Sequence, residues 1–214
     1  MEKGPNGEGA QIPEASKDML KDPFQKQNIV FHIIDERIPF DENTTKEELQ
    51  EYYYKYFLNN DPDNWKRGAF HYCLIIYHTF YPGFVFRTTV NGKHMTDSFQ
   101  ISTRNHEGLP LKKPIYDSIR RLTFNRERQR ELIYASAMMH ETGHVLGIYR
   151  QNTPACDNID SVFPNKEWFK YRNYKSSMNY NLVYNFVDYS DGSRGKNDFD
   201  DWARIDLTRF KNEY

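Results

Sequence analysis

The sequence predicts an α+β protein, in which an α/β upper lobe with a mixed, twisted sheet and a backing helix precedes an irregular C-terminal part. Three observations support this class. Strand-like runs of β-branched and aromatic residues occur in the first half of the 214 residues, helical patterns flank them, and the chain after Gly147 is rich in Asn, Asp, Tyr and Gly. The length suits one domain, divided into an N-terminal arm (1–27), an upper lobe (28–147) and a lower subdomain (148–214).

The N-terminal arm, residues 1–27, is polar and rich in Gly, Pro and Lys, so we expect an extended segment or loop. Such a segment could also inhibit the protein by covering a functional site. The run Asn-Ile-Val-Phe-His-Ile-Ile-Asp at residues 28–35 then predicts the first buried strand, because its apolar residues are nearly continuous.

A helix is predicted for residues 46–58. Thr45 precedes this segment and Glu48 lies three residues further on, which is the pattern of a capping box at a helix N-terminus. Leu49 and Tyr53 are four residues apart and therefore share one apolar face of the helix. We expect this face to lie against the sheet.

Three more segments predict strands. Residues 70–78 form the most strand-like run and are apolar on both faces, as expected of a central strand. Residues 84–90 and 97–103 are two further strands, and the Asn91-Gly92 pair between them is typical of a hairpin turn.

Three further helices are expected. Residues 113–122 are a candidate for the first of them. Residues 131–139 contain no Pro or Gly and predict an apolar helix, starting at 126 or later, that lies across the sheet and ends at Gly147 in a left-handed cap. Residues 200–210 predict a closing helix whose inner face includes Trp202 and Ile205.

The helix that ends at Gly147 carries the pattern His140-Glu141-x-x-His144. Side chains four residues apart lie on one face of a helix, so the two imidazoles can bind a single Zn²⁺. The Glu141 carboxylate lies beside the first ligand, where it can take a proton from a water that attacks a carbonyl. Two histidines on a helix can also be ordinary polar or core residues, but the apolar helix leading into the pattern favours the metal site.

This region resembles the metzincin zinc peptidases, whose signature is His-Glu-x-x-His-x-x-Gly-x-x-His or Asp followed by a Met-turn. His140 to Gly147 match the signature through the glycine, as in the small snapalysins, and Ser176-Ser177-Met178-Asn179-Tyr180 is similar to the Met-turn. The stretch 152–157 is also similar to one in archaeal and bacterial metzincin-like proteins. The resemblance implies that Met178 forms an apolar base under the metal and that Tyr180 hydrogen-bonds the substrate oxyanion, as in the astacin-like and serralysin-like branches.

The sequence departs from the metzincin pattern at the third ligand. That position is Arg150, whose guanidinium stays protonated and cannot bind zinc. A catalytic site needs three protein ligands, and our first choice for the third is Asp157, a carboxylate on the loop that leaves the helix. The alternatives are Cys156, Asp160, Asn152 and, by analogy with the gluzincins, Glu167. A degenerate site that binds metal poorly is a further alternative.

Composition excludes some partners and leaves others open. With 29 basic and 30 acidic residues and no basic stripe, we expect no nucleic-acid partner. No apolar run approaches the ~20 residues that span a bilayer, so no membrane partner is expected. The first residues lack the apolar core of a signal peptide, so the chain stays in the cell or has lost its export signal. The two cysteines, Cys73 and Cys156, permit one disulfide without requiring it.

The acidic residues between 188 and 201 could bind Ca²⁺ or could simply form a solvated loop.

Together these features predict a zinc-dependent endopeptidase. The expected substrate is an extended peptide or protein that pairs with an edge strand, for which we choose residues 99–103. The alternatives are an inactive, peptidase-like metal-binding module, which Arg150 favours and Glu141 opposes, and a latent enzyme blocked by residues 1–27 or by the Cys156 thiolate.

Overall fold

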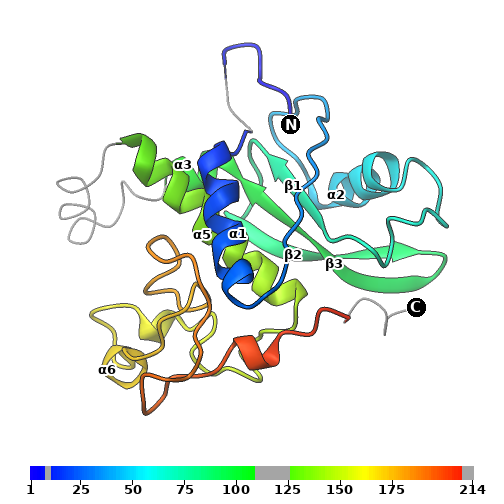
Figure 1. Ribbon diagram of the computed structural model, residues 1–214. Coiled ribbons are helices and arrows are strands. Elements are labelled where there is room, and N and C mark those ends of the chain that lie inside the picture. Colours follow the sequence, from blue (N-terminus) through cyan, green and yellow to red (C-terminus); the bar gives the residue numbers. More distant parts are fainter. Residues whose placement is uncertain (8–10, 109–125, 209–214) are drawn as a thin grey trace. The chain divides into compact units, whose positions relative to one another are not determined.

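The structure is a computed structural model that describes residues 1–7, 11–108 and 126–208 (Figure 1). It is a mixed α+β protein, as predicted, and the chain splits into two compact units. The first unit comprises Met1–Ile12, Ile34–Thr123 and Leu207–Tyr214, and the second comprises Pro13–Ile33 and Phe124–Asp206. This grouping differs from the predicted division, because the helix with the two histidines belongs with residues 148–206 and not with the sheet. Its predicted packing across the sheet stays a prediction.

The first unit contains a three-stranded sheet in the order β1-β3-β2. Its strands are β1 (Tyr72–Ile76), β2 (Gly83–Val90) and β3 (Lys93–Ser102). The hairpin between β2 and β3 is confirmed, with positive φ angles of 50° at Asn91 and 76° at Gly92. Strand β1 runs parallel to β3, with Cys73 opposite Phe99, whereas β2 is antiparallel to it.

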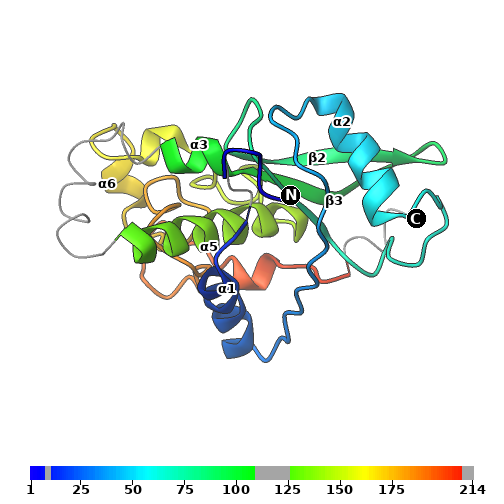
Figure 2. The same cartoon turned by 90° about the horizontal axis from the view of Figure 1, so that it is seen from above.

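Two sequence expectations about this sheet are wrong. The segment around β1 lies at one side of the sheet, and the central strand is β3. Figure 2 shows β3 beside its antiparallel partner β2. Residues 98–102 of β3 pair with β1, and residues 98–101 also pair with β2. A strand with hydrogen-bonded neighbours on both sides has no free edge, so the segment 99–103 cannot receive a substrate peptide as an edge strand.

Helix α2 (Lys46–Tyr52) continues as a π-helical turn, η1 (Tyr53–Phe57). The capping box is confirmed: the Glu48 amide donates to Thr45 Oγ1 at 3.3 Å, and the Thr45 amide donates to Glu48 Oε2 at 2.7 Å. The predicted apolar face enters the core of this unit, where the Tyr53 hydroxyl donates to the buried Asp97 carboxylate at 2.9 Å. The buried core comprises Met1, Ile38, Leu49, Tyr53, Phe57, Leu58, Leu74, Ile76, Phe86 and Val90. A short helix, α3 (Thr103–Gly108), follows β3.

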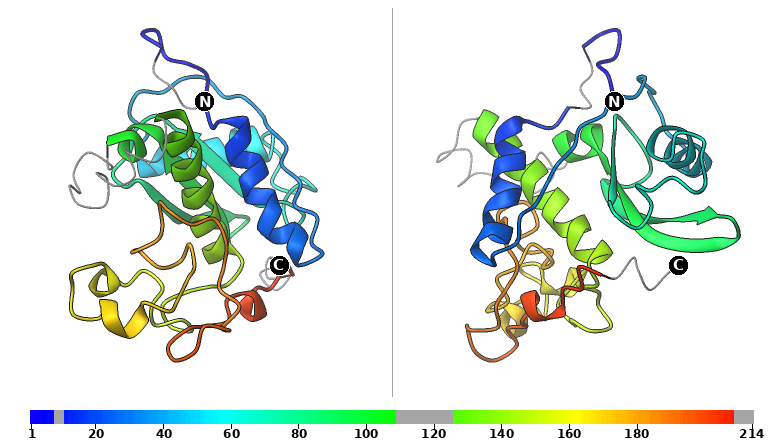
Figure 3. Two further views of the ribbon diagram at one scale, coloured as in Figure 1. Left: turned by 60° about the vertical axis from the view of Figure 1, so that its left-hand side comes forward. Right: turned by 45° about the vertical axis from the view of Figure 1, so that its right-hand side comes forward.

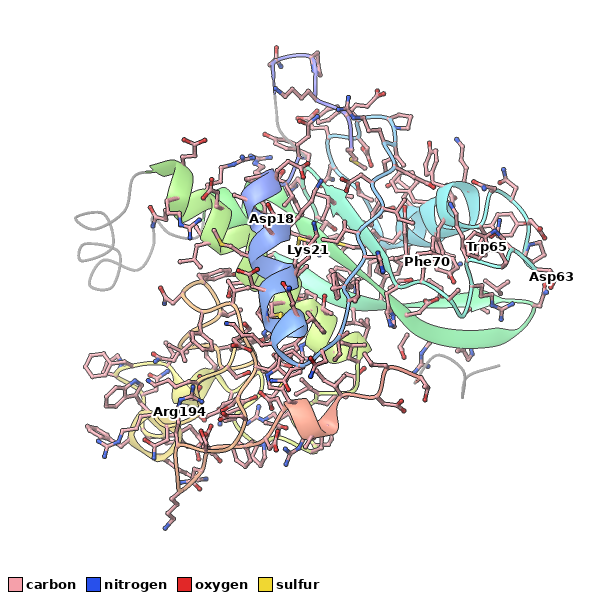
Figure 4. All side chains as sticks on the ribbon, in the orientation of Figure 1. Asp18, Lys21, Asp63, Trp65, Phe70 and Arg194 are labelled. Carbon is pink, nitrogen blue, oxygen red and sulfur yellow. The ribbon has the colours of Figure 1, made fainter. Side chains whose placement is uncertain are left out.

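The second unit pairs two helices, α1 (Glu14–Lys26) and α5 (Arg126–Val145), which lie side by side in Figure 3. The expected extended arm is therefore wrong for residues 14–26. Ser16, Leu20 and Phe24 recur every four residues and are fully buried on one face. The Ser16 hydroxyl donates to the Glu131 carbonyl of α5 at 2.8 Å. The Asp18–Lys21 pair stands on the exposed face (Figure 4).

The strand predicted at 28–35 does not form. Val30 and Ile34 are 76% and 68% exposed, and the segment has no strand partner among the described residues. A β-branched run becomes a strand only where a neighbour takes its backbone hydrogen bonds. Here the segment is held by α1 instead: the Phe31 ring lies 4.5 Å from that of Phe24, and the Ile29 amide donates to the Phe24 carbonyl at 3.0 Å.

The rest of the second unit is irregular, as predicted for the chain after Gly147. It contains η3 (Ile159–Ser161), α6 (Trp168–Tyr171) and η4 (Trp202–Arg204). The predicted closing helix is wrong over residues 200–208, because only η4 forms and the chain becomes extended at Ile205 (φ −64°, ψ 123°). The candidate helix at 113–122 lies outside the described residues. Among the described helices, none is both long enough and apolar enough to cross a membrane.

Candidate metal centre

The last two turns of α5 carry the two predicted histidines. His140 and His144 are 5% and 8% exposed, and their Nε2 atoms lie 3.2 Å apart. Glu141, between them in sequence, is 6% exposed. The helix therefore directs both imidazoles to one point, as the four-residue spacing predicts.

The second nitrogen of each ring is held by the backbone. His140 Nδ1 lies 2.9 Å from the Ser177 carbonyl oxygen, and His144 Nδ1 lies 2.8 Å from the Ile148 carbonyl oxygen. A carbonyl can only accept, so each Nδ1 carries the hydrogen and donates it. In the neutral tautomer this leaves both Nε2 lone pairs available for a metal, an arrangement common among metal-binding histidines.

Asp157 completes the group. Its Oδ1 lies 3.1 Å from His140 Nε2 and its Oδ2 lies 3.3 Å from His144 Nε2. Among the described residues, these three side chains form the group of potential ligands whose atoms all lie within 4.8 Å of one another. The Asp157 backbone is left-handed (φ 51°), and its amide donates to the Met178 carbonyl at 3.2 Å. The Met178 segment thus holds the carboxylate against the two rings.

The other candidate ligands do not join the group. Arg150 is exposed. Cys156 is buried, and burial followed by the nearby Asp157 charge raises the pKa of its thiol, which disfavours a thiolate. Asp160 lies 3.8 Å from Lys166, and Glu167 accepts a hydrogen bond from Asn158 at 2.7 Å. Cys73 and Cys156 do not form a disulfide.

Asn152, another candidate ligand, instead shapes the turn after the helix. Its Oδ1 accepts the Tyr149 amide at 2.9 Å and its Nδ2 donates to the Gly147 carbonyl at 2.8 Å. Gly147 itself has the positive φ (107°) that the sequence predicts. This turn reverses the chain after the helix, so that Asp157 can return to the two histidines.

The cluster of His140, His144 and Asp157 stabilises positive charge on the His140 imidazole. Burial alone would lower the pKa of His140, but the Asp157 hydrogen bond and the Glu141 charge outweigh it and raise the pKa of His140 to about 9. Burial also opposes ionisation of Asp157, yet its contacts with His140 and His144 hold the pKa of that carboxyl well below its usual range. A carboxylate that stays ionised beside two imidazoles suits a divalent cation.

Glu141 differs from these ligands. Burial raises the pKa of Glu141, while the charges of His140 and His144 oppose the rise. Its Oε2 is buried and has no hydrogen-bond partner among the described residues. A buried carboxylate oxygen without a donor is costly, so it fits a site in which a bound water or substrate supplies the hydrogen bond. The residues present therefore fit a metal with an attached water.

The segment around Met178 lies directly beneath α5. Met178 is fully buried, and a Cβ at Gly143 would collide with its sulfur and lie 3.1 Å from a Tyr189 ring carbon. Glycine is therefore needed at 143 for the methionine to approach the helix between the two histidines. The Tyr189 hydroxyl donates to the Met139 carbonyl at 2.6 Å and fixes the same contact.

Two tyrosines flank the imidazoles. The Tyr180 ring lies 5.6 Å from that of His140, and the Tyr149 ring lies 5.5 Å from that of His144, with interplanar angles of 30° and 20°. Burial, followed by the charges of Asp157 and Glu141, raises the pKa of Tyr180, which therefore keeps its proton. The sequence indicated Tyr180 but not Tyr149 or the Ser177 carbonyl. A backbone carbonyl leaves no mark in a sequence, and one tyrosine among 16 gives no signal.

The acidic loop does not form an open cation site. Arg194 (Figure 4) places Nη1 3.4 Å from the Asp191 carboxylate and 3.9 Å from the Asp198 carboxylate. Ser190 Oγ donates to Asp198 at 2.6 Å, and Asp201 accepts a hydrogen bond from a buried tyrosine. The carboxylates are thus satisfied by protein donors, and the structure gives no support to a calcium site.

Comparison with known proteins gives one family match to report. Residues 7–106 match the model of a family described as a domain of unknown function, DUF7948. The matched region includes α1, α2 and the three strands, and it ends before α5 and the metal ligands. No curated protein and no solved structure matches the chain.

Proposed function

We propose that this protein is a zinc-dependent endopeptidase with a metzincin-like catalytic site. The observation that carries the proposal is the convergence of His140, His144 and Asp157 beside Glu141, whose buried Oε2 lacks a hydrogen-bond partner in the described part of the chain. Two imidazoles and one carboxylate are a ligand set found at catalytic zinc sites, where a fourth position is left to water or substrate. The Met178 segment under the helix supports the metzincin resemblance.

Each residue has a distinct role in the proposed reaction. Zinc held by the three ligands would supply Lewis acidity, which activates water and polarises the scissile carbonyl. Glu141 accepts the proton of the attacking water and delivers it to the leaving amine, a function that its raised pKa suits. Tyr180 retains its proton and donates a hydrogen bond to the developing oxyanion.

The proposal is tested by removing the base while keeping the ligands. Glu141→Ala should bind about one zinc per chain, as the wild type does, but lose cleavage of casein or gelatin by ~10³-fold or more, because base and acid catalysis disappear. Metal content is measured by mass spectrometry and cleavage by fluorescence. Zinc binding without cleavage in the wild type would favour the alternative, a non-catalytic metal-binding module. The presence of Arg150 at the usual position of the third ligand supports that alternative.

A further inference from the structure

We propose that an aromatic shelf on the segment that follows Asp157, formed by the exposed Phe163 and Phe169 and the half-buried Trp168, binds a bulky apolar side chain of the peptide substrate. The proposal deepens the proposed function and rests on it. The shelf belongs to the segment that connects Asp157 to the Met178 turn, drawn in yellow around α6 in Figure 1.

The segment of the shelf carries most of the strongly exposed apolar side chains of the second unit. The described residues of the second unit include four strongly exposed large apolar side chains, and three of them are in this segment: Ile159 at 59%, Phe163 at 41% and Phe169 at 69%. Trp168 links the two phenylalanines, with ring centroids 5.3 Å from Phe163 and 4.8 Å from Phe169. Exposed aromatic clusters of this kind mark binding sites more often than single exposed side chains do.

Hydrogen bonds join the segment of the shelf to residues next in sequence to Tyr180 and Asp157. The Phe163 amide donates at 3.2 Å to Asn181, the residue after Tyr180. Ser161 Oγ lies 2.9 Å from Asn179 Oδ1, on the other side of Tyr180 in sequence. Asn158 follows Asp157 directly, and its Nδ2 donates at 2.7 Å to Glu167, the residue before Trp168. These contacts position the aromatic rings on the same loops as the third ligand and the oxyanion donor.

The basic residues around the shelf are few, and half of them are paired with acidic residues, unlike those of a membrane-binding segment. Residues 159–175 contain four basic and two acidic side chains, a net charge of +2. Lys166 lies 3.8 Å from Asp160, and Lys170 lies 3.6 Å from Glu167. Membrane-binding segments typically carry clusters of about 4–8 basic residues, whereas here two of the four are beside acidic partners. The remaining feature is aromatic area, which suits a phenylalanine or leucine side chain.

The test uses pairs of fluorogenic peptides. The two peptides of a pair differ at one residue, which is phenylalanine in one and serine in the other, and each pair places this residue at a different position around the cleaved bond. At one position the wild type should show a KM about 10-fold lower for the phenylalanine peptide, since burying such a side chain changes affinity by at least this factor. Phe169→Ser should bring the ratio of the two KM values close to one. Phe80 is exposed to a similar extent (75%, against 69% for Phe169) but lies in the other unit, so Phe80→Ser is the matched control and should leave the ratio unchanged.

A binding measurement separates this proposal from the proposed function. In the Glu141→Gln background, fluorescence anisotropy should show that the labelled phenylalanine peptide binds about 10-fold more weakly when Phe169→Ser is added. If no variant cleaves peptides but this loss is seen, the shelf stands and the enzyme proposal falls. Equal KM ratios in wild type and Phe169→Ser would contradict the proposal that the shelf binds substrate. Attachment to phosphatidylserine vesicles that depends on Phe169, with no effect of Phe169→Ser on peptides, would also contradict it.

Discussion

The Asp157 carboxylate is the decisive side chain at the residue scale, because it approaches both Nε2 atoms within 3.3 Å. In the metzincin signature the third ligand follows the glycine by three residues, and in this sequence that position, three residues after Gly147, is Arg150. The substitution is tolerable because the site needs one anionic oxygen at the right point in space and not at a given distance along the chain. A turn that returns the chain to the helix meets that need.

Asp157→Ala should therefore lower zinc affinity by at least ~100-fold, since even removing an outer partner of a ligand costs about 10–100-fold. Chelator competition followed by metal analysis measures the change. The matched control is Asp160→Ala, which removes a carboxylate only three residues away that pairs weakly with Lys166 and should leave affinity unchanged. An equal effect of both variants would contradict the ligand assignment.

Single residues also show how far prediction from sequence reaches. His140, Glu141 and His144 could be assigned because one turn of helix fixes their relative positions. Tyr149 could not, because its contact with His144 depends on the turn that Asn152 closes. Asp157 was chosen on the chemistry of its carboxylate, and four alternatives on the same loops remained open until their spatial partners were known.

At the scale of elements, α1 changes the interpretation of the N-terminal segment. We expected an arm that could cover the site, whereas residues 14–26 form a helix packed on α5. The Phe24 ring lies 6.1 Å from that of Tyr189 and 5.3 Å from that of Trp202, and Tyr189 in turn holds the Met139 carbonyl. The helix thus helps to build the unit that carries the candidate metal ligands.

Phe24→Ala should lower the free energy of unfolding by about 3–5 kcal/mol, the usual cost of a large cavity in a core, because Phe24 is fully buried. Chemical denaturation followed by tryptophan fluorescence measures it. Asp18→Ala, on the exposed face of the same helix, should change stability by less than about 0.5 kcal/mol.

Deleting residues 1–27 removes the whole of α1 and should therefore also destabilise the protein. Increased peptidase activity in that variant would instead support the latency hypothesis.

The elements themselves were predictable in proportion to how local their causes are. The capping box of Thr45 and Glu48 and the Asn91-Gly92 turn act over two to four residues, and both were predicted correctly. The strand at 28–35 and the central position of β1 were wrong, since both depend on which distant segment accepts the hydrogen bonds. The prediction of a closing helix was wrong, because the helical spacing of its apolar residues does not by itself continue the helix past Arg204, and the backbone is extended at Ile205.

At the scale of the whole molecule, one buried carboxyl should influence stability as a function of pH. Asp201 accepts a hydrogen bond from the Tyr174 hydroxyl at 2.7 Å. Burial raises the pKa of Asp201 to about 6, even though hydrogen bonds from Ser176, Tyr174 and Ser190 favour its ionised form. The folded protein therefore binds this proton more tightly than the unfolded chain does, for which 3.8 is the ordinary value.

The sign follows from proton linkage. Between pH ~4 and ~6 the folded state holds more protons, so the Asp201 contribution to stability is present below pH ~4 and is lost as pH rises through about 6. At ~1.4 kcal/mol per pKa unit the loss is about 3 kcal/mol. Asp201→Asn cannot titrate, so its stability relative to wild type should rise by about this amount between pH 4 and pH 7, as measured by urea denaturation. A pH-independent difference would contradict the raised pKa.

By itself, the sequence determined the α+β composition, the capping box of Thr45 and Glu48, the Asn91-Gly92 turn, and the facing pair of histidines with Glu141 beside them. All of these follow from hydrogen bonds and side-chain spacings within a few residues. Only the tertiary structure decided the strand order, the helical state of residues 14–26 and the return of Asp157 to His140 and His144. These depend on contacts between segments far apart in the chain, whose energies no local pattern records.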